Sequence, residues 1–293
     1  MRAKVSVFCC DAADWSHKGP PFSLLLTDPP YSRAGSTHTS TTTATRGKTL
    51  ERVFSDQMWV GWIVPRLQRA LVACAPEACA FIFCDWRTIG ALERAVIETG
   101  CGWNLSQVAV WDRESMGLGS PLRAGHELIA FARGPKFKWE GRRDIINMFR
   151  HRWPYGAHEH HGSEKPVDLL REIIRDFGGG GPVLDPFCGS GSTLVACKAE
   201  SVDGVGLEID PEVARVAAER AGIRTSIMSA TVVRRDEHGR LWLMSRQARG
   251  WGAFGYPHDN ESELLLRWRV RLGPWSEDEH GPFCPAWPEV AGT

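Results

Sequence analysis

The sequence predicts an α/β protein with a doubly wound, mainly parallel seven-stranded sheet and a small β-rich C-terminal appendage. Three observations support this class. Short apolar, β-branched runs alternate with segments of helical periodicity through residues 1–225. Two turn motifs, at residues 28–31 and 185–192, each follow one of these apolar runs. Beyond residue 225 the alternation stops, and the remaining sequence is rich in tryptophan and proline.

Seven runs have the length and composition of β-strands. Each is apolar or alternating and is bounded by turn residues such as glycine, proline and aspartate. Because helical segments separate several of them, we expect parallel pairing through crossover connections. The seven predicted strands cover residues 4–9, 23–27, 78–84, 105–111, 127–132, 182–184 and 203–208.

The segments between these runs have the periodicity of helices. We expect a helix over residues 56–74, kinked by Pro65, and a second over residues 87–99 that ends at Gly100. A third is predicted over residues 163–177, with Ser163 as its N-cap. Two further helices should begin near Ser190 and near Pro211. Four tryptophans on these elements are predicted to be structural core residues: Trp59, Trp62, Trp86 and Trp111.

The C-terminal region has a different character. Residues 231–235 and 240–245 flank a turn at 236–239, which predicts a hairpin, and residues 264–272 alternate as a strand with a basic face. We therefore expect an α/β domain over residues 1–225, with an insertion at 134–162, and a β-rich extension of unknown role over residues 226–293.

The composition is that of an ordinary globular protein. The 293 residues are 43% hydrophobic and 24% charged, and no apolar run approaches the roughly 18 residues that cross a bilayer. Asp11 and Asp14 interrupt any secretory pattern, so no membrane association and a cytoplasmic location are expected. Nine cysteines without a C-x-x-C pair indicate reduced thiols. The tract at residues 158–161 is too short to surround a metal ion, so no metal is expected.

The net charge is zero, but basic residues gather within the insertion. Aromatic residues, including Trp139 and Phe149, lie between them, and this is the composition of a nucleic-acid surface. An ordinary solvated loop has the same composition, so both interpretations stay open. The residues predicted to contact DNA are Lys136, Lys138, Arg142, Arg143 and Arg150.

The first turn motif, Asp28-Pro29-Pro30-Tyr31, suits chemistry on an exocyclic amino group. Such a nitrogen is a poor nucleophile because its lone pair is delocalised into the base. A carboxylate and a backbone carbonyl that accept its two N–H groups favour the tetrahedral geometry needed for attack. Asp28 and the Pro29 carbonyl fit these roles, the prolines stiffen the turn, and the Tyr31 ring offers a stacking partner.

The second turn motif suits a nucleotide-like cofactor. Gly189 and Gly191 permit a tight turn and a close approach of the ligand, and the following helix N-terminus offers free N–H groups. Glu208, at the end of the next predicted strand, is placed to accept two ribose hydroxyls. The remaining residues assigned to this cofactor site are Asp185, Phe187, Ser190 and Ser192.

Together the two motifs resemble the signature motifs of S-adenosylmethionine-dependent DNA amino-methyltransferases. The catalytic motif comes first, which is the order of the beta class, and this order implies a permuted Rossmann-like methyltransferase fold. The segments at residues 161–166 and 8–14 resemble two further family motifs near the cofactor. The resemblance implies that Lys165 packs near the methionine end of the cofactor and that Asp11 accepts the adenine amino group.

The resemblance implies an enzyme that methylates a base flipped out of double-stranded DNA. Asp28 favours adenine N6 as the target, since serine at this position is more usual for cytosine N4. Cytosine N4 methylation, an RNA or protein-glutamine methyltransferase and an inactive DNA-binding homologue stay open as alternatives. Such proteins occur in bacteria and phages, alone or beside a restriction endonuclease, and a homodimer is also compatible.

Overall fold

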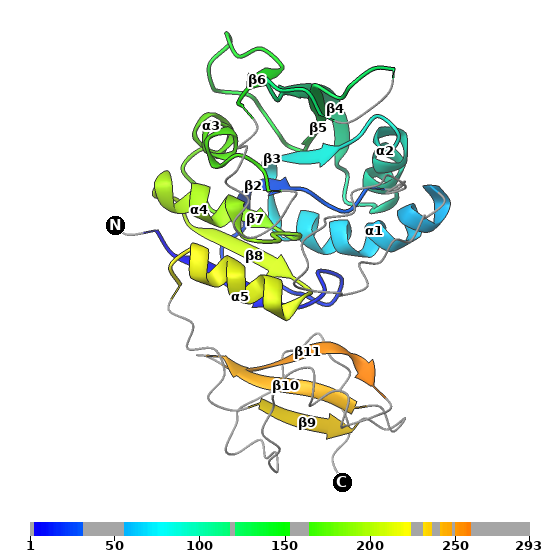
Figure 1. Cartoon of the computed structure of the whole chain (residues 1–293), viewed down its shortest axis with the longest axis vertical. Helices are drawn as coiled ribbons and strands as arrows, with labels where there is room; N and C mark the ends of the chain where they lie inside the picture. Colours follow the sequence, from blue (N-terminus) through cyan, green and yellow to red (C-terminus); the bar gives the residue numbers. More distant parts are fainter. Residues whose placement is uncertain are drawn as a thin grey trace.

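The computed structural model describes residues 3–31, 56–117, 121–152, 164–223 and the strand residues 231–235, 241–247 and 250–258. Its main body is one eight-stranded sheet with helices on both faces (Figure 1). The tract at residues 158–161 and the predicted strand at 264–272 lie outside the described residues, as does the segment at 32–55.

All seven predicted strands are present in the main sheet. The strand bounds are β1 (Val5–Cys9), β2 (Phe22–Thr27), β3 (Cys74–Cys84), β4 (Asn104–Asp112), β5 (His126–Arg133), β6 (Met148–Arg150), β7 (Val183–Asp185) and β8 (Gly204–Glu208). β6 is an eighth strand that the sequence analysis did not predict. It lies inside the predicted insertion and pairs with β4.

The strand order is β1-β8-β7-β2-β3-β5-β4-β6. Every pair is parallel except the two made by β5, which is antiparallel to both β3 and β4. The carboxyl ends of β2, β7 and β8 therefore lie at one edge of the sheet, together with the start of β5. We call this edge the catalytic edge and the opposite one the distal edge. Both turn motifs follow strands that end at the catalytic edge.

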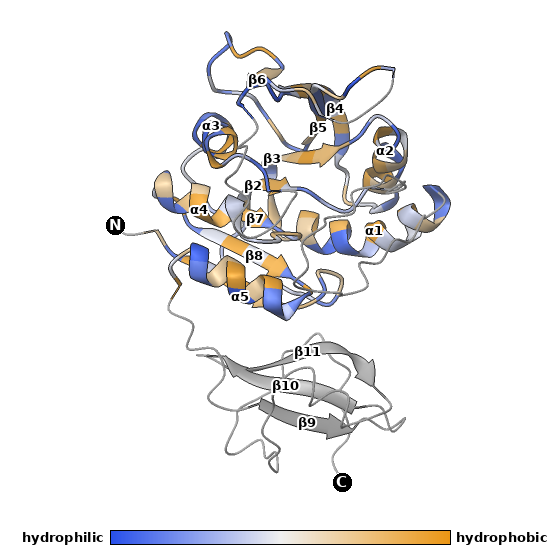
Figure 2. Cartoon of the chain, in the orientation of Figure 1, coloured by the Kyte–Doolittle hydropathy of each residue, from blue (hydrophilic) through white to orange (hydrophobic). Residues whose placement is uncertain are grey.

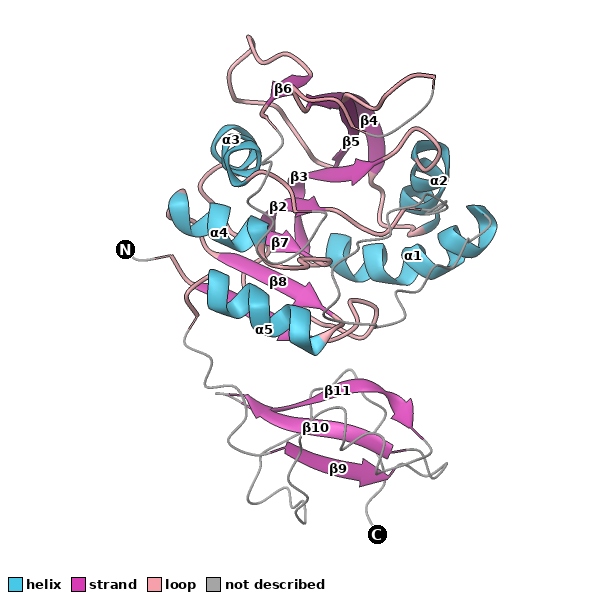
Figure 3. Ribbon diagram, viewed as in Figure 1, coloured by secondary structure: helices cyan, strands magenta, loops and turns pink. Residues whose placement is uncertain are grey.

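The buried strands supply two cores because successive side chains point to opposite faces. On one face Leu25, Ala80 and Ile82 pack against α1 (Asp56–Val72) and α2 (Ile89–Glu98). On the other face Leu24 and Phe81 pack against α3 (Val167–Phe177) and α4 (Ser192–Ala199). α5 (Pro211–Arg220) adjoins α4 beside β8 (Figure 3). Hydrophobic colour dominates β3, whereas β8 shows orange and pale bands, and hydrophobic and polar colours alternate along the helices (Figure 2).

The helix ends differ from the prediction at two points. α3 begins at Val167 with Pro166 at the N-cap position, so the predicted start at Ser163 is wrong. Pro166 has a ψ of 127°, which is not helical, and proline disfavours helical conformation in the residue before it. The helix therefore begins one residue later, at Val167. α4 begins at Ser192 after Gly191, close to the predicted start, and α1 contains Pro65 as predicted.

Trp59 and Trp111 are fully buried, as predicted. Trp86 is not a core residue, because 76% of its surface is exposed in the turn after β3. The assignment failed because aromatic residues at strand ends can point outward, and a turn has no periodicity that would reveal this. The eight cysteines within the described ranges are free thiols. None of the described helices is long and apolar enough to cross a membrane.

The C-terminal strands form a separate antiparallel sheet in the order β11-β10-β9. β9 (Thr231–Arg235) and β10 (Leu241–Gln247) make the predicted hairpin, with Arg235 paired to Leu241. β11 (Gly250–His258) pairs with the other side of β10 and was not predicted.

Candidate active site

Asp28 is the first residue after β2, which lies between β7 and β3 in the middle of the sheet. Its carboxylate is held from two distant parts of the chain. Lys165, just before α3, forms an ion pair with Asp28 Oδ2. Glu127, near the start of β5, lies 3.3 Å from the same lysine through its Oε2. Asp28 Oδ1 is buried and has no hydrogen-bond partner within the described structure. One oxygen of this carboxylate is therefore held by Lys165, and the other is buried with its acceptor positions unfilled.

Burial raises the pKa of Asp28 above its usual range, while Lys165 acts to lower it and Glu127 to raise it. For Lys165, burial opposes the charged form, but the Asp28 and Glu127 carboxylates outweigh burial and raise its pKa. Burial and the same two carboxylates hold the pKa of Tyr31 well above its usual range, so Tyr31 is a neutral phenol. The site thus combines an ion pair with an uncharged aromatic ring.

The Asp28–Tyr31 turn is fixed by hydrogen bonds from its surroundings. The Trp59 indole N–H of α1 donates to the Pro30 carbonyl at 2.7 Å. The Tyr31 hydroxyl donates to Glu127 Oε2 at 3.4 Å. Because these contacts come from two different elements, α1 and β5, the fold sets the position of the turn and its tyrosine ring.

The glycine loop follows β7, the direct neighbour of β2. Asp185, only 3% exposed, accepts hydrogen bonds from Thr27 at 2.7 Å, from Thr193 at 2.6 Å and from the Phe187 backbone N–H at 3.1 Å. Burial raises its pKa to about 6, although these three donors lower it. Asp185 therefore organises the loop and ties it to β2. Its carboxylate does not face outward to a ligand.

The loop has the shape of a ligand cradle. Gly189 and Gly191 have positive φ angles of 49° and 84°. A Cβ on Gly191 would lie 2.9 Å from the Ala217 Cβ, so α5 packs directly against this turn. A Cβ on Gly189 would meet nothing within 4 Å. Gly191 is thus required by packing, whereas Gly189 leaves its backbone open to a ligand.

Glu208 ends β8 and lies beside this loop. Its carboxylate accepts the Gly189 backbone N–H at 3.1 Å and the Asp210 backbone N–H at 2.8 Å, and burial raises its pKa. A carboxylate oxygen has two acceptor sites, so each oxygen can still receive one ligand hydroxyl. The predicted residues Gly189 and Glu208 are therefore in contact. This arrangement fits a ribose held next to the loop.

The polar side of the loop is held by Arg220 of α5. The Arg220 guanidinium donates to the Ser190 carbonyl at 2.9 Å and to the Ser190 hydroxyl at 2.7 Å, and it lies 3.5 Å from the Ser192 hydroxyl. Glu164 accepts from the Ser190 hydroxyl at 3.1 Å and pairs with Arg220 at 3.3 Å. The sequence analysis did not assign Arg220 to the site. An arginine at the C-terminus of a helix is usually solvated, and no sequence pattern marks one that binds a loop.

Asp11 follows β1, which pairs with β8, so it lies on the Glu208 side of the site. Its carboxylate accepts the Ala13 backbone N–H at 2.9 Å and forms an ion pair with Arg66 of α1. The Arg66 guanidinium lies 4.2 Å from the centre of the Trp62 ring, and this ring in turn lies 5.9 Å from the Phe187 ring. Asp11 and Phe187 are thus linked by a line of side chains that the sequence did not reveal.

The structure adds to one sequence assignment, Lys165, and to one omission, Glu127. Lys165 was assigned to the cofactor, but the structure places its ammonium on Asp28 and Glu127. Glu127 was not assigned at all. A charged residue at the start of an otherwise apolar strand was the available signal, although surface strands often begin that way.

The predicted DNA-binding residues are divided between the two edges of the sheet. The chain leaves β5 at the distal edge, where the Lys136 backbone N–H donates to the Pro76 carbonyl at 2.9 Å. Lys138, Arg142 and Arg143 follow there. β6 then returns parallel to β4 and places Arg150 beside Asp112 at the catalytic edge. β3 spans about 20 Å between its residues 78 and 84, so the two groups lie roughly that far apart.

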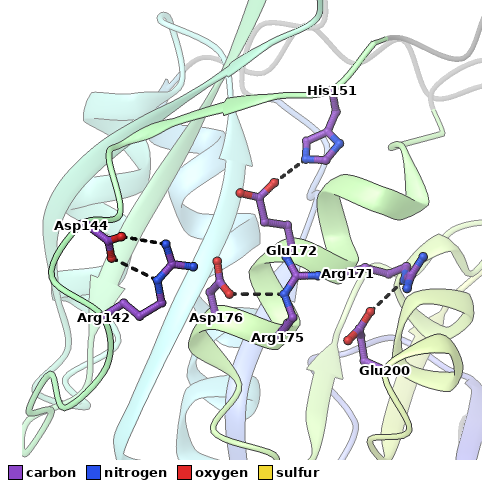
Figure 4. A network of polar contacts seen from close by, with 8 residues as sticks. All are labelled: Arg142, Asp144, His151, Arg171, Glu172, Arg175, Asp176 and Glu200. Carbon is purple, nitrogen blue, oxygen red and sulfur yellow. Dashed lines mark hydrogen bonds and ion pairs between the residues drawn. The ribbon is translucent and has the colours of Figure 1, made fainter.

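Ion pairs lie on and near α3, between the distal basic residues and Arg150. Arg142 forms a bidentate pair with Asp144 at 3.0 and 2.9 Å, and both side chains are exposed (Figure 4). His151, directly after β6, contacts Glu172 of α3 at 2.5 Å. The His151–Glu172 contact fixes the end of β6 on the helix. The Arg142–Asp144 pair joins two neighbours within one loop.

The fold and the site define a class of protein: a parallel α/β sheet whose catalytic edge carries a carboxylate-aromatic turn beside a glycine-loop nucleotide cradle. The DNA methylase family model, which covers N6 and N4 amino-methyltransferases, matches residues 22–219. This match includes more than half of the chain, so the chain belongs to the DNA methylase family and is a DNA methyltransferase.

Individual relatives agree with this assignment. The chain is 26% identical over 205 residues to the methylase YubD of Escherichia coli K12, which covers 69% of this chain and 82% of YubD. It is 30% identical over 150 residues to the type II methyltransferase M.Cfr9I of Citrobacter freundii. This match covers 46% of this chain and 48% of M.Cfr9I, about half of that enzyme.

Solved structures share the fold. The M1.HpyAVI–SAM complex matches with a TM-score of 0.56 at 21% identity and covers 74% of this chain and 98% of that one. The PvuII DNA methyltransferase, described as cytosine-N4-specific, matches with a TM-score of 0.59 at 16% identity and covers 75% of this chain and 86% of that one. At these identities the likeness concerns the fold alone.

Proposed function

We propose that this enzyme transfers a methyl group from S-adenosylmethionine to N6 of adenine in double-stranded DNA. The observation that carries the proposal is the Asp28 carboxylate at the end of β2. Its Oδ2 is held by Lys165, and its Oδ1 is buried and has no partner in the described part of the chain. A hydrogen-bond donor from outside the protein, such as an exocyclic amino group, would satisfy this oxygen.

The methyl donor fits the residues at the end of β7. The open backbone face of Gly189 and the N-terminus of α4 suit the polar end of the ligand, and Glu208 suits its ribose hydroxyls. Asp11 and Phe187, linked through Arg66 and Trp62, suit the adenine moiety. When bound, S-adenosylmethionine supplies an electrophilic methyl group on a sulfonium centre.

The protein's own residues prepare the nucleophile. A base that leaves the duplex, at a cost of a few kcal/mol, stacks on the neutral Tyr31 ring. Asp28 Oδ1 accepts one N–H of its amino group, which favours a tetrahedral nitrogen with an available lone pair. Bonding of the nitrogen to the methyl carbon would break the carbon–sulfur bond, release the sulfur as a neutral thioether and leave the nitrogen positively charged. The Asp28 carboxylate would stabilise that charge. The nitrogen then loses a proton, for which Asp28 is the nearest acceptor.

Adenine is the proposed target because the turn carries Asp28 where the enzymes of similar motif that act on cytosine N4 more often carry serine. Of the five basic residues predicted to contact DNA, Arg150 is the one that lies at the catalytic edge, and it is proposed to contact the DNA backbone. The type II methyltransferases among the relatives support a modification role, and a partner restriction endonuclease is part of this proposal.

Nucleoside mass spectrometry tests the proposal. The chain is expressed in a bacterial host that lacks its own DNA methyltransferases, beside the Asp28→Ala variant as control. Genomic DNA from the wild type should contain N6-methyladenine, and DNA from the variant should not. N4-methylcytosine would select the cytosine alternative. Methyl transfer to RNA or protein, without transfer to DNA, would overturn the DNA assignment.

A further inference from the structure

Three segments that are far apart in the sequence meet behind Asp28. Asp28 follows β2, Glu127 belongs to β5, and Lys165 precedes α3. The Lys165 side chain is only 8% exposed and the Glu127 side chain 18%. A buried lysine between two carboxylates is costly to assemble, and removing one member of such a group leaves an uncompensated buried charge. The arrangement therefore calls for a functional explanation.

The contacts within this group form a chain that leads from Glu127 through Lys165 to Asp28. The Lys165 ammonium pairs with Asp28 Oδ2 and lies 3.3 Å from Glu127 Oε2. Glu127 Oε1 lies 3.8 Å from the Arg113 guanidinium, and the Phe83 ring lies 5.1 Å from the Lys165 ammonium. Glu127 is therefore anchored on one side and holds Lys165 on the other. Lys165 in turn holds one oxygen of Asp28.

We propose that Lys165 and Glu127 are positioning residues for Asp28. Lys165 fixes the carboxylate by Oδ2, so that Oδ1 faces the target amine. Glu127 holds Lys165 and neutralises it, so that the three side chains together keep one negative charge for the nitrogen that becomes positive during methyl transfer. This inference deepens the proposed function and rests on Asp28 acting in methyl transfer.

The two residues act on Asp28 with opposite signs. Lys165 favours the ionised carboxylate, whereas Glu127 disfavours it. Burial is the largest cause that raises the pKa of Asp28, and the nearby Tyr31 hydroxyl acts to lower it. Cys84 and Asp185 lie near enough to feel the same charges. Only Lys165 and Glu127 are changed in the test, so the other groups act as a constant background.

The test measures the ionisation of Asp28 directly. Side-chain carboxyl carbons of aspartate are labelled with carbon-13, and the Asp28 signal is assigned as the one lost in Asp28→Asn. Lys165→Met should raise the pKa of Asp28 because it removes the cation. Glu127→Gln should lower it because it removes the second carboxylate. Each shift should be about one unit, the size expected from one neighbouring charge. Lys18→Met, an exposed lysine before β2, is the matched control and should cause no shift.

Enzyme kinetics give a second reading. The low-pH limb of kcat should move to higher pH in Lys165→Met and to lower pH in Glu127→Gln, with a loss of kcat on the order of 10²-fold at neutral pH in the lysine variant. Lys165→Arg keeps the charge and should recover part of this loss. Calorimetry with S-adenosylmethionine alone should give dissociation constants within about threefold of the wild type.

Each contrary result has its own meaning. Asp28 titrations that do not change, or that shift in the same direction in both variants, would overturn the inference. A tenfold or greater loss of S-adenosylmethionine affinity in Lys165→Met, with an unchanged Asp28 titration, would return Lys165 to the cofactor site. If Lys165→Met does not fold, Glu127→Gln and Lys165→Arg carry the test. If the two variants shift the pKa of Asp28 in opposite directions but the wild type methylates no DNA, the proposed function is rejected and the positioning role of Lys165 and Glu127 stands.

Discussion

The two edges of the main sheet carry charged residues in opposite ways. At the catalytic edge Lys165 and Asp185 are buried, Asp28 is half-buried, and all three are held by partners from distant segments. At the distal edge Arg142 and Asp144 are exposed and are paired only two residues apart. Charges that are costly to bury are concentrated where chemistry is proposed. The distal pair has the properties of an ordinary surface ion pair, which contributes little to stability.

The comparison also bears on how the enzyme meets DNA. The basic insertion begins at the distal edge with Lys136 and ends at the catalytic edge with Arg150. A duplex that delivers a base to Asp28 must lie over the catalytic edge. Basic composition alone therefore does not locate the DNA surface, and the direction of the strands predicts that the duplex lies nearer to Arg150 than to Lys136.

The largest effect is expected from removing the catalytic carboxylate. Asp28→Ala should lower kcat by 10²–10⁴-fold, roughly the contribution of a positioned acid–base group. The S-adenosylmethionine dissociation constant should stay within about threefold, because Asp28 does not belong to the glycine loop. Radiolabelled methyl transfer and calorimetry measure the two quantities. A large loss of cofactor affinity would contradict the separation of the two sites.

A glycine in the cofactor loop should be nearly as sensitive. Gly191→Ala places a Cβ 2.9 Å from the Ala217 Cβ at a φ of 84°, so the loop must shift. The expected result is a loss of about 1–3 kcal/mol in stability together with weakened S-adenosylmethionine binding. Gly61→Ala is the matched control, since its added Cβ meets nothing within 4 Å in α1. The control should be neutral or slightly stabilising in urea unfolding. Equal effects of both substitutions would reject the packing argument.

The buried Asp185 predicts a pH-dependent stability. Its folded-state pKa is raised to about 6, above its unfolded value. The stability it contributes is therefore present at low pH and is lost as pH rises through the folded pKa. Between pH 4 and pH 7 the wild type should lose on the order of 2–3 kcal/mol relative to Asp185→Asn. Asp144→Asn at the distal edge should leave the stability profile unchanged. Parallel profiles for wild type and Asp185→Asn would contradict the burial argument.

The smallest effects concern DNA binding. Arg150→Ala should weaken DNA binding severalfold and reduce the salt slope by about one. The sequence prediction also assigns Lys136, Lys138, Arg142 and Arg143 to DNA. Their position at the distal edge predicts that Arg142→Ala with Arg143→Ala weakens binding less than Arg150→Ala alone. Fluorescence anisotropy over a series of salt concentrations measures both. A larger effect of the distal pair would place the duplex over the distal edge.

Local patterns predicted most of the fold. The seven strands followed from apolar runs such as 23–27, because buried central strands need continuous hydrophobic residues. β6 was missed because Met148–Arg150 has no pattern of its own and exists through pairing with β4. Trp86 was misassigned because a turn residue has no repeating face that shows its direction.

The site was predicted in part, for a related reason. Glycines in a turn and an acidic residue at the end of the next strand predict a cofactor loop from their short spacing. The sequence therefore predicted Gly189 and Glu208 as parts of one site, and the two are in contact. In the group of Asp28, Glu127 and Lys165, the Asp28–Lys165 contact joins residues that are 137 positions apart along the chain, and Glu127 comes from a third element between them. Only the order of strands in the sheet brings them together, and no local pattern encodes that order.

The most direct test of the account is a crystal structure of the enzyme with sinefungin, an unreactive analogue of the methyl donor, and a duplex. The duplex carries the sequence that methylation mapping of host DNA returns. The account predicts an adenine outside the helix, stacked on Tyr31, with its N6 within hydrogen-bond distance of Asp28 Oδ1 and with Lys165 still on Oδ2. A target amine bound away from Asp28, or a target base that remains stacked in the duplex, would contradict it.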